Sequence, residues 1–248
     1  MKLLIITDQH FGVRNDNQVF LDKYRKFYEK IVIPFIDKYE ITNVLCLGDS
    51  FDKRKSINYN SLESAKDMWF TPLAERGIHM DMLIGNHDIY FKNTLRVNSP
   101  SLLLSEYDNI NVVDAPCEID YDGRSICLIP WICDDNRNET LKVIEESKAD
   151  ICMGHLELNG FEAIPGHIMD HGDDPSIFEK FNLVCSGHFH MKSRRGNVNY
   201  LGNPYQLYWG DYGQQRGFHV LNTDTTKLTF LPNPYNIFQK IYYDDTKK

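Results

Sequence analysis

The chain has 248 residues, 42% of them hydrophobic and 12% aromatic, which is enough to bury a core in one large domain or in one domain with an appendage. Its formal net charge of −8 at pH 7 argues against a protein that grips a polyanion over its whole surface. No apolar run approaches the roughly 20 residues that span a membrane, and the first strand starts too early for a signal peptide, so we expect a cytoplasmic protein.

The first part of the chain alternates short apolar runs with helical patterns. Strands are expected over residues 2–7, 44–47 and 80–84, and helices over residues 18–39 and 58–74. Val19 belongs to the expected apolar face of the first helix, and Pro34 should kink that helix or end it near Ile33. Strands that alternate with helices of this length predict βαβ units with parallel pairing.

Shorter elements are expected in the second part of the chain. A helix over residues 101–107 should have Ser99 as its N-cap and Pro100 in its first position. A helix is also expected over residues 135–148, a long loop over residues 156–174, and strands over residues 111–114, 117–120, 125–129, 150–153, 197–201, 217–222, 227–231 and 237–243. His167 and His171 lie in the long loop and are interpreted as loop residues, not as metal ligands.

Five apolar runs end in small residues or in residues that can bind a metal. In chain order the motifs are D-x-H (Asp8, His10), G-D-x-x-D (Asp49, Asp52), G-N-H-D (Asn86, His87, Asp88), G-H (His155) and G-H-x-H (His188, His190). Ligands of open α/β sheets bind beyond the carboxyl ends of the strands, so these side chains should converge on one site. Imidazole suits zinc, manganese, iron and nickel, which makes a metal site the expected result.

This ordered set of motifs resembles the calcineurin-like metallophosphoesterase family, from Lys2 to about Pro204. Residues 48–52 and 86–104 are most similar to the nuclease subunits of SbcCD-type DNA repair complexes and to the small subunit of the recombination endonuclease of tailed phages. The resemblance implies an α/β fold with two mixed β-sheets packed face to face and flanked by helices. It also implies a nuclease domain over residues 1–205 and a β-strand tail over residues 206–248, either the start of a truncated capping domain or the end of a minimal family branch.

The resemblance further implies two divalent metal ions, for which manganese is favoured. It assigns Asp8, His10 and His190 to the first ion, Asn86, His155 and His188 to the second, and Asp49 to a bridge between them. His87 matches the catalytic histidine of the family that stays outside the metal shells. Asp88 is expected to orient His87, and Asp52 either caps a turn or supports the ligands from behind.

Basic residues lie close to the motifs in sequence and are candidates for contacts to DNA phosphates, with an ordinary solvated surface as the alternative. They are Arg14, Lys53, Arg54, Lys55, Lys92, Arg96, Lys192, Arg194 and Arg195. An aromatic cluster follows the last motif, at Tyr205, Tyr208, Trp209 and Tyr212. Packing at a domain junction and stacking on unpaired bases both fit it.

The expected function is therefore a manganese-dependent 3′-to-5′ exonuclease and single-strand endonuclease, which works with a coiled-coil ATPase of the SbcC type. The alternatives are a phosphoesterase for small molecules or phosphoproteins, and a DNA-end-binding scaffold. The resemblance also suggests a homodimer, with residues 58–74 and 101–107 as the candidate interface. Its apolar contacts would be Met68, Trp69, Leu102 and Leu103.

Overall fold

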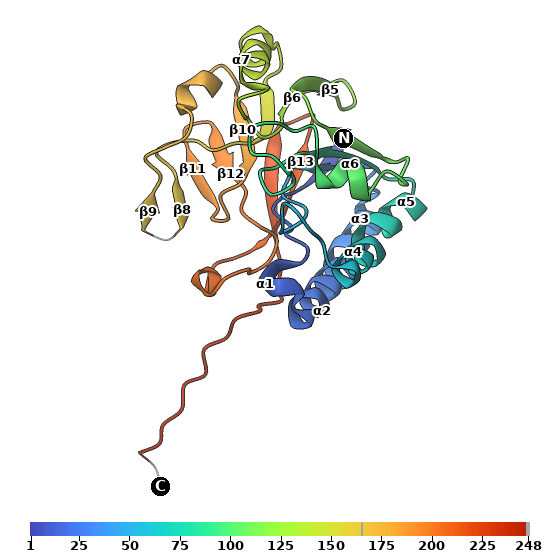
Figure 1. The fold of residues 1–248 in the computed structure, drawn as a ribbon, viewed down its shortest axis with the longest axis vertical. Helices are drawn as coiled ribbons and strands as arrows, with labels where there is room; N and C mark the ends of the chain where they lie inside the picture. The colour runs from blue at the N-terminus through green and yellow to red at the C-terminus, as the bar shows by residue number, and fades with distance from the viewer. Residues whose placement is uncertain (165, 247–248) are drawn as a thin grey trace.

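The computed structural model describes residues 1–164 and 166–246, and two six-stranded β-sheets form its centre (Figure 1). In the first sheet the order is β14 (Lys227–Pro232), β13 (Gly217–Asn222), β1 (Lys2–Ile6), β2 (Asn43–Cys46), β3 (His79–Leu83) and β4 (Ile110–Val113). In the second it is β11 (Ser193–Arg195), β12 (Val198–Tyr200), β10 (Leu183–Gly187), β7 (Ile151–His155), β6 (Ser125–Ile129) and β5 (Cys117–Asp120).

Both sheets are mixed, with antiparallel pairing at one edge of the first sheet and at both edges of the second. Strands β1 to β4 are parallel to one another, whereas β13 pairs antiparallel with both β1 and β14. In the second sheet β6, β7, β10 and β12 are parallel, and β5 and β11 pair antiparallel at the two edges. The α/β class with two mixed sheets is thus confirmed.

The sheets pack face to face because their strands are apolar on both sides. Leu3 and Ile5 of β1 share a buried cluster with Ile151 and Met153 of β7 between the sheets. The alternate residues of β1 face a layer of helices formed by α2 (Gln18–Phe27), α3 (Ile33–Tyr39), α4 (Tyr59–Ala65) and α5 (Thr71–Glu75) (Figure 1). Helix α7 (Arg137–Glu146) covers the outer face of the second sheet through Ile144. Strands buried on both faces appear as continuous apolar runs, which is why the motifs stand out in the sequence.

Pro34 and Pro72 lie inside continuous helices and end neither of them, so of the two outcomes expected for Pro34, the end of the helix near Ile33 is wrong. Each proline is the second residue after a π-helical turn, η1 (Tyr28–Val32) or η2 (Lys66–Phe70). In these turns the Ile33 N–H bonds to the Tyr28 carbonyl, and the Thr71 N–H bonds to the Lys66 carbonyl. The wider turn accommodates a residue that has no N–H to donate.

Several smaller expectations are wrong. Val19 is 59% exposed, because other residues of α2 form the face of the helix that packs against the core. Helix α6 (Ser99–Leu103) starts one residue early, since the Asn98 side chain accepts the hydrogen bond from the Ser101 N–H at 2.8 Å. The long loop contains a small hairpin of β8 (Glu162–Ile164) and β9 (His167–Ile168).

The predicted strand over residues 237–243 is also wrong. Its apolar side chains find no sheet edge within residues 1–164 and 166–246, and Ile241, Tyr242 and Tyr243 are exposed. The chain extends away from the body of the molecule there (Figure 1). Strands β13 and β14, which lie within the predicted tail 206–248, belong to the first sheet. Residues 247–248 of that tail lie outside the described residues.

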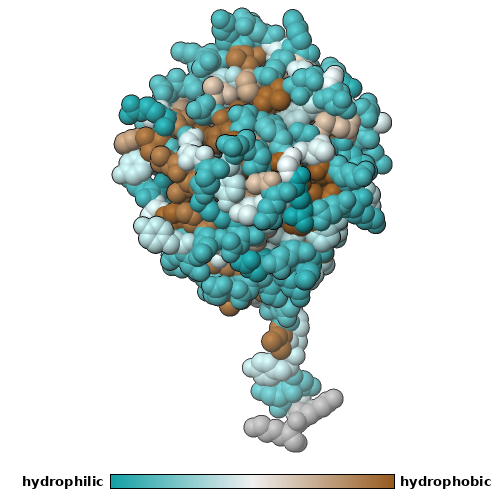
Figure 2. All heavy atoms as spheres, turned by 90° about the vertical axis from the view of Figure 1, so that its right-hand side faces the viewer, coloured by the Kyte–Doolittle hydropathy of each residue, from teal (hydrophilic) through white to brown (hydrophobic). Residues whose placement is uncertain are grey.

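Two of the proposed dimer contacts are not available at the surface. Met68 and Trp69 are buried in the chain's own core, whereas Leu102 is 68% exposed. Figure 2 shows the face that carries the helices as largely hydrophilic, with scattered hydrophobic patches. Across the described ranges, no helix combines the length and the apolar character needed to cross a membrane.

Candidate metal centre

The carboxyl ends of five strands meet at one place that both sheets share. Asp8 and His10 follow β1, Asp49 follows β2, Asn86 follows β3, His155 ends β7, and His188 and His190 follow β10. The structure brings all seven predicted ligands into two adjoining clusters. The convergence predicted from the strand ends is therefore present.

The first cluster consists of Asp8, His10 and His190, whose ligand atoms all lie within 4.8 Å of one another. The two Nε2 atoms of the histidines are 3.1 Å apart, and Asp8 Oδ1 lies 3.9 Å from Nε2 of His190. Burial, and then the neighbouring His10, hold the pKa of His190 well below its ordinary value. His190 is therefore neutral and has a nitrogen lone pair to give to a cation.

The second cluster consists of Asn86, Asp49, His155 and His188. The Asn86 side-chain oxygen lies 3.0 Å from His155 Nε2 and 2.8 Å from His188 Nδ1. The Leu47 carbonyl oxygen lies 2.6 Å from His155 Nδ1 and can only accept, so this nitrogen is the donor. That hydrogen bond fixes the ring and directs His155 Nε2 toward the cluster.

Asp49 lies between the two clusters. Its Oδ2 is 3.8 Å from His10 Nε2 in the first cluster and 3.3 Å from His155 Nε2 in the second. Burial opposes the charge of Asp49, but His155 and His10 outweigh burial and lower the pKa of the carboxyl. Burial likewise lowers the pKa of His155, and Asp49 outweighs it and raises that pKa to about 9. An ionised carboxylate in this position can serve two cations.

The donor set fits two divalent cations. Metal–nitrogen and metal–oxygen bonds of about 2.0–2.2 Å place neighbouring ligand atoms about 3 Å apart, which is close to the 2.8–3.3 Å separations within the second cluster. The mixture of imidazole, carboxylate and amide oxygen suits manganese or iron, whereas magnesium and calcium prefer oxygen alone.

The backbone around these ligands is strained. Asp8, His10, Asp49 and His188 all have positive φ angles, between 45° and 85°, which L residues rarely adopt. A Cβ on Gly85 would collide with the Asp49 carboxylate, and one on Gly187 would collide with the Thr7 hydroxyl. The glycines of the motifs thus allow the ligand loops to approach one another, and strain of this kind concentrates at functional sites.

His87 lies at the edge of both clusters. It offers a ring nitrogen within 4.8 Å of ligand atoms of His10 and Asp49, and its ring meets the His10 ring edge-on at 4.8 Å between centroids. The Asp52 carbonyl oxygen accepts a hydrogen bond from His87 Nδ1 at 2.6 Å. The Asp52 carboxylate lies 3.5 Å from His10 Nδ1, so Asp52 helps to position both histidines.

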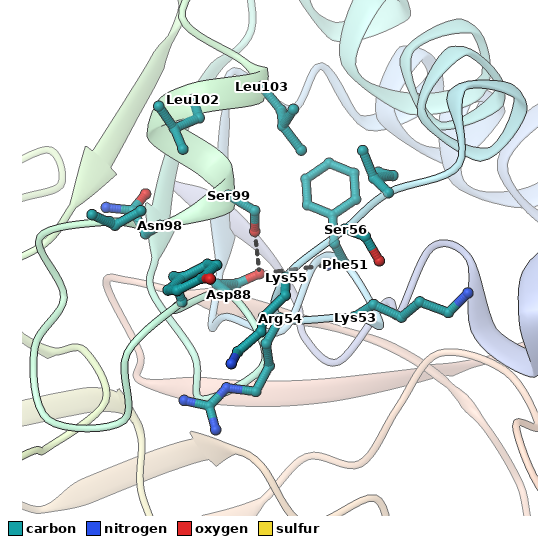
Figure 3. Close-up of a pocket in the computed structure, with 13 residues that line it drawn as sticks. Phe51, Lys53, Arg54, Lys55, Ser56, Asp88, Asn98, Ser99, Leu102 and Leu103 are labelled. Atoms are coloured by element: carbon teal, nitrogen blue, oxygen red, sulfur yellow. Dashed lines mark hydrogen bonds between the residues drawn. The ribbon is translucent and has the colours of Figure 1, made fainter.

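Asp88 does not orient His87, which corrects the expected contact. Its buried carboxylate accepts hydrogen bonds from the backbone N–H groups of Asp49 (2.8 Å), Gly85 (2.9 Å) and Ser50 (3.2 Å). The Ser99 hydroxyl at the start of α6 is 3.4 Å away (Figure 3). Asp88 therefore ties the loop after β2 to the loop after β3 and holds Asp49 in place.

One acidic residue near the ligands was missed from the sequence. Glu157 Oε1 lies 3.6 Å from His188 Nε2 and 3.4 Å from His171 Nε2. The nearby His188 imidazole lowers the pKa of Glu157. An acid two residues after His155, on the same extended segment, was the available signal. His167 and His171 are exposed, and neither is in the groups of possible ligands that the described residues form; His167 lies in β9 and not in a loop.

The predicted basic residues occupy different surroundings. Arg14, Lys53, Arg54 and Lys55 are anchored locally, to the Leu207 carbonyl, the Asp16 carboxylate, the Ile89 carbonyl and the Tyr90 ring. Lys53, Arg54 and Lys55 also line a cavity of about 160 Å³ that Asp88 borders (Figure 3). Lys192 is exposed with its Nζ over the Phe230 ring, and Lys92, Arg96, Arg194 and Arg195 are exposed as well.

Sequence comparisons with known proteins agree with the motifs that form the two clusters. A family model described as calcineurin-like phosphoesterase matches residues 1–192. The chain is 37% identical to exonuclease subunit 1 of Enterobacteria phage T4 over 247 residues, covering 98% of this chain and 71% of that protein. It is 22% identical to a subunit of the nuclease SbcCD of Staphylococcus saprophyticus, covering 94% and 69%. The solved structure of an archaeal phosphodiesterase aligns over 94% of this chain and 100% of its own, with 12% identity and a TM-score of 0.47.

The contacts of Asp88 predict how the site responds to its replacement. Asp88→Asn keeps the shape but turns an NH₂ group toward backbone N–H donors, so it should destabilise the fold by about 2–3 kcal/mol and loosen Asp49. Thermal unfolding and metal content after gel filtration measure both effects. The exposed Asp108→Asn is the matched control. Wild-type melting temperature and metal content in Asp88→Asn would contradict the role given to this carboxylate.

Proposed function

Because the chain belongs to the calcineurin-like phosphoesterase family, we propose that it hydrolyses DNA phosphodiester bonds at its two clusters, as a 3′-to-5′ exonuclease and single-strand endonuclease. The predicted enzyme class, a metal-dependent phosphodiesterase, agrees with the family match and with the similarity to the phage exonuclease subunit. The observation that carries the proposal is the position of Asp49 between two complete sets of ligands. The proposed location is the cytoplasm of a bacterium or of a phage-infected host cell.

The residues of the chain have separate parts in this reaction. Asp8, His10 and His190 would hold one manganese ion and Asn86, His155 and His188 the other, with Asp49 shared. Two such ions, when bound, supply a nucleophile at neutral pH and neutralise the phosphoryl oxygens. Asn86 contributes an uncharged oxygen, so the site keeps a net positive charge for an anionic substrate.

His87 is the proposed general acid. The Asp52 carbonyl occupies its Nδ1, which fixes the ring and leaves Nε2 to meet the substrate. A proton held at Nε2 can pass to the leaving oxygen as the phosphodiester bond breaks. Asp52 orients this ring, and Asp88 acts at a distance through the backbone of Asp49.

We propose that the chain needs a partner protein to degrade long duplex DNA. The net charge of −8 gives weak sequence-independent attraction to a polyanion. The 248 residues contain no G-x-x-x-x-G-K-[ST] run with which to bind a nucleoside triphosphate. Both curated relatives are named as subunits of larger enzymes. A coiled-coil ATPase of the SbcC type is the partner that we propose.

The substrate class is tested with purified protein and manganese. Labelled single-stranded DNA, cyclic nucleotides and p-nitrophenyl phosphate are offered in parallel, and we expect DNA to be cut with a preference for single strands and ends. A chelator should abolish cleavage, and added manganese should restore it. Turnover of the small esters with DNA left intact would support a small-molecule phosphoesterase instead.

Two substitutions separate metal binding from proton transfer. His87→Asn should retain both metal ions and lose turnover by about 10²–10⁴-fold, because general acid catalysis typically contributes that much. Asp49→Asn should lose metal as well, because it removes the shared negative charge. Metal analysis and DNA cleavage are measured on the same samples. Full activity in His87→Asn with unchanged metal content would show that the proposed role is wrong.

The partner is tested with a duplex of kilobase length at physiological salt. Alone, these 248 residues should cut short single strands with manganese and without ATP. Processive degradation of the duplex should require the ATPase and ATP. Efficient resection by the nuclease chain alone would remove the reason for proposing the partner.

A further inference from the structure

A groove of about 510 Å³ opens beside the candidate ligands His188 and His190. Ile164 at the end of β8 and Tyr208 after the last motif also line it, and both contribute exposed apolar surface. Its size lies within the roughly 300–1,000 Å³ of small-ligand sites. The groove shares two residues with the metal clusters, so a substrate held at the clusters has room to extend into it.

Tyr208 has surroundings unlike those of a core aromatic residue. It is 44% exposed, and its ring lies nearly parallel to the His190 ring, at 6.3 Å between centroids and 11° between planes. The Arg14 guanidinium lies over the Tyr208 ring at 4.8 Å. By contrast, the neighbouring Tyr205 is buried and stacks on Tyr24, so packing explains that member of the aromatic cluster and not Tyr208.

A buried ion pair holds this side of the groove rigid. The Asp211 carboxylate accepts hydrogen bonds from the backbone N–H groups of Leu207 (2.7 Å) and Tyr208 (3.1 Å), and it pairs with Arg216 at 2.7 Å. Arg216 also donates a hydrogen bond to the His190 carbonyl. One guanidinium thus links the Tyr208 loop to a candidate metal ligand, so the groove is preorganised.

A strained turn presents Arg14 at the same place. Arg14, Asn15 and Asp16 have φ angles of 55°, 57° and 62°, a left-handed turn of three consecutive residues that L residues disfavour. Asp16 anchors the turn through Lys53 (2.9 Å) and the buried Ser61 hydroxyl (2.7 Å). Such strain persists where the surrounding structure enforces it, and it is common at sites that bind ligands.

We infer that this groove binds the base of an unpaired nucleotide beside the scissile phosphate, with the base on Tyr208 and the flanking phosphate near Arg14. The inference rests on the proposed nuclease function. A nucleobase is a planar apolar group with a negatively charged phosphate on each side of it in the strand. The Tyr208 ring correspondingly lies between the metal centre, which is cationic when metal is bound, and the Arg14 guanidinium. A paired base would bring its partner strand against the segments of Ile164 and Tyr208, so the groove favours single strands.

Oligonucleotide binding tests this site without DNA cleavage. The full chain is titrated with a short single-stranded oligonucleotide that carries a fluorescent 2-aminopurine, with divalent metal chelated so that no cleavage occurs. Tyr208→Ala should weaken binding about tenfold, and Tyr208→Phe, which keeps the ring, should restore it. Tyr59→Ala, at an 87% exposed tyrosine of α4, is the matched control and should bind like the wild type. Equal affinity of wild type and Tyr208→Ala would overturn the inference.

A kinetic comparison separates this inference from the proposed function. With manganese, kcat/KM is measured for thymidine 5′-(p-nitrophenyl phosphate), which carries a base, and for methyl p-nitrophenyl phosphate, which does not. The ratio of the two values should fall about tenfold in Tyr208→Ala and recover in Tyr208→Phe. A wild-type enzyme that cleaves both esters, with the same ratio in Tyr208→Ala, would overturn the base site alone. Failure of the wild type to cleave labelled single-stranded DNA under the same conditions would overturn the proposed function itself.

Discussion

The buried Asp49 carboxylate joins the two clusters of the candidate metal centre. It lies between two groups of imidazoles, and its position is set by backbone hydrogen bonds to Asp88, which is itself buried. Burial, and then the charge of Asp49, raise the pKa of Asp88 to about 6, so the two carboxyl groups oppose each other. Charges buried this close together are costly unless cations neutralise them, and the glycines and strained ligand loops bring donors for such cations to the same point.

The fold explains why the ligands come from such distant parts of the chain. Parallel strands of two separate sheets end at a shared edge, so each sheet contributes loops to both clusters: His10 and His190 meet in one, and Asn86 and His155 in the other. The helices and the inter-sheet core keep these ends in register. A change far from the site, such as a shift of one sheet against the other, would therefore separate the two halves of each cluster.

Most of this arrangement could be predicted from the sequence, because buried strands give continuous apolar runs and each run ends in a recognisable motif. Asp8, His10 and Asp49 were placed in this way. Orientation could not be predicted: Asp88 follows His87 in the chain, yet its carboxylate points to the backbone of a different loop. The strand expected over residues 237–243 is wrong for a similar reason. An apolar run in the sequence does not show whether the folded chain brings it next to a sheet edge.

Two metal ions that share Asp49 would occupy the two clusters. Anomalous diffraction from crystals grown with manganese tests this arrangement most directly, because the signal locates the metal independently of any assumption about the ligands. We expect two peaks, about 3.5–4 Å apart, one in each cluster with Asp49 between them. A single peak, or peaks that Asp49 does not touch, would contradict it.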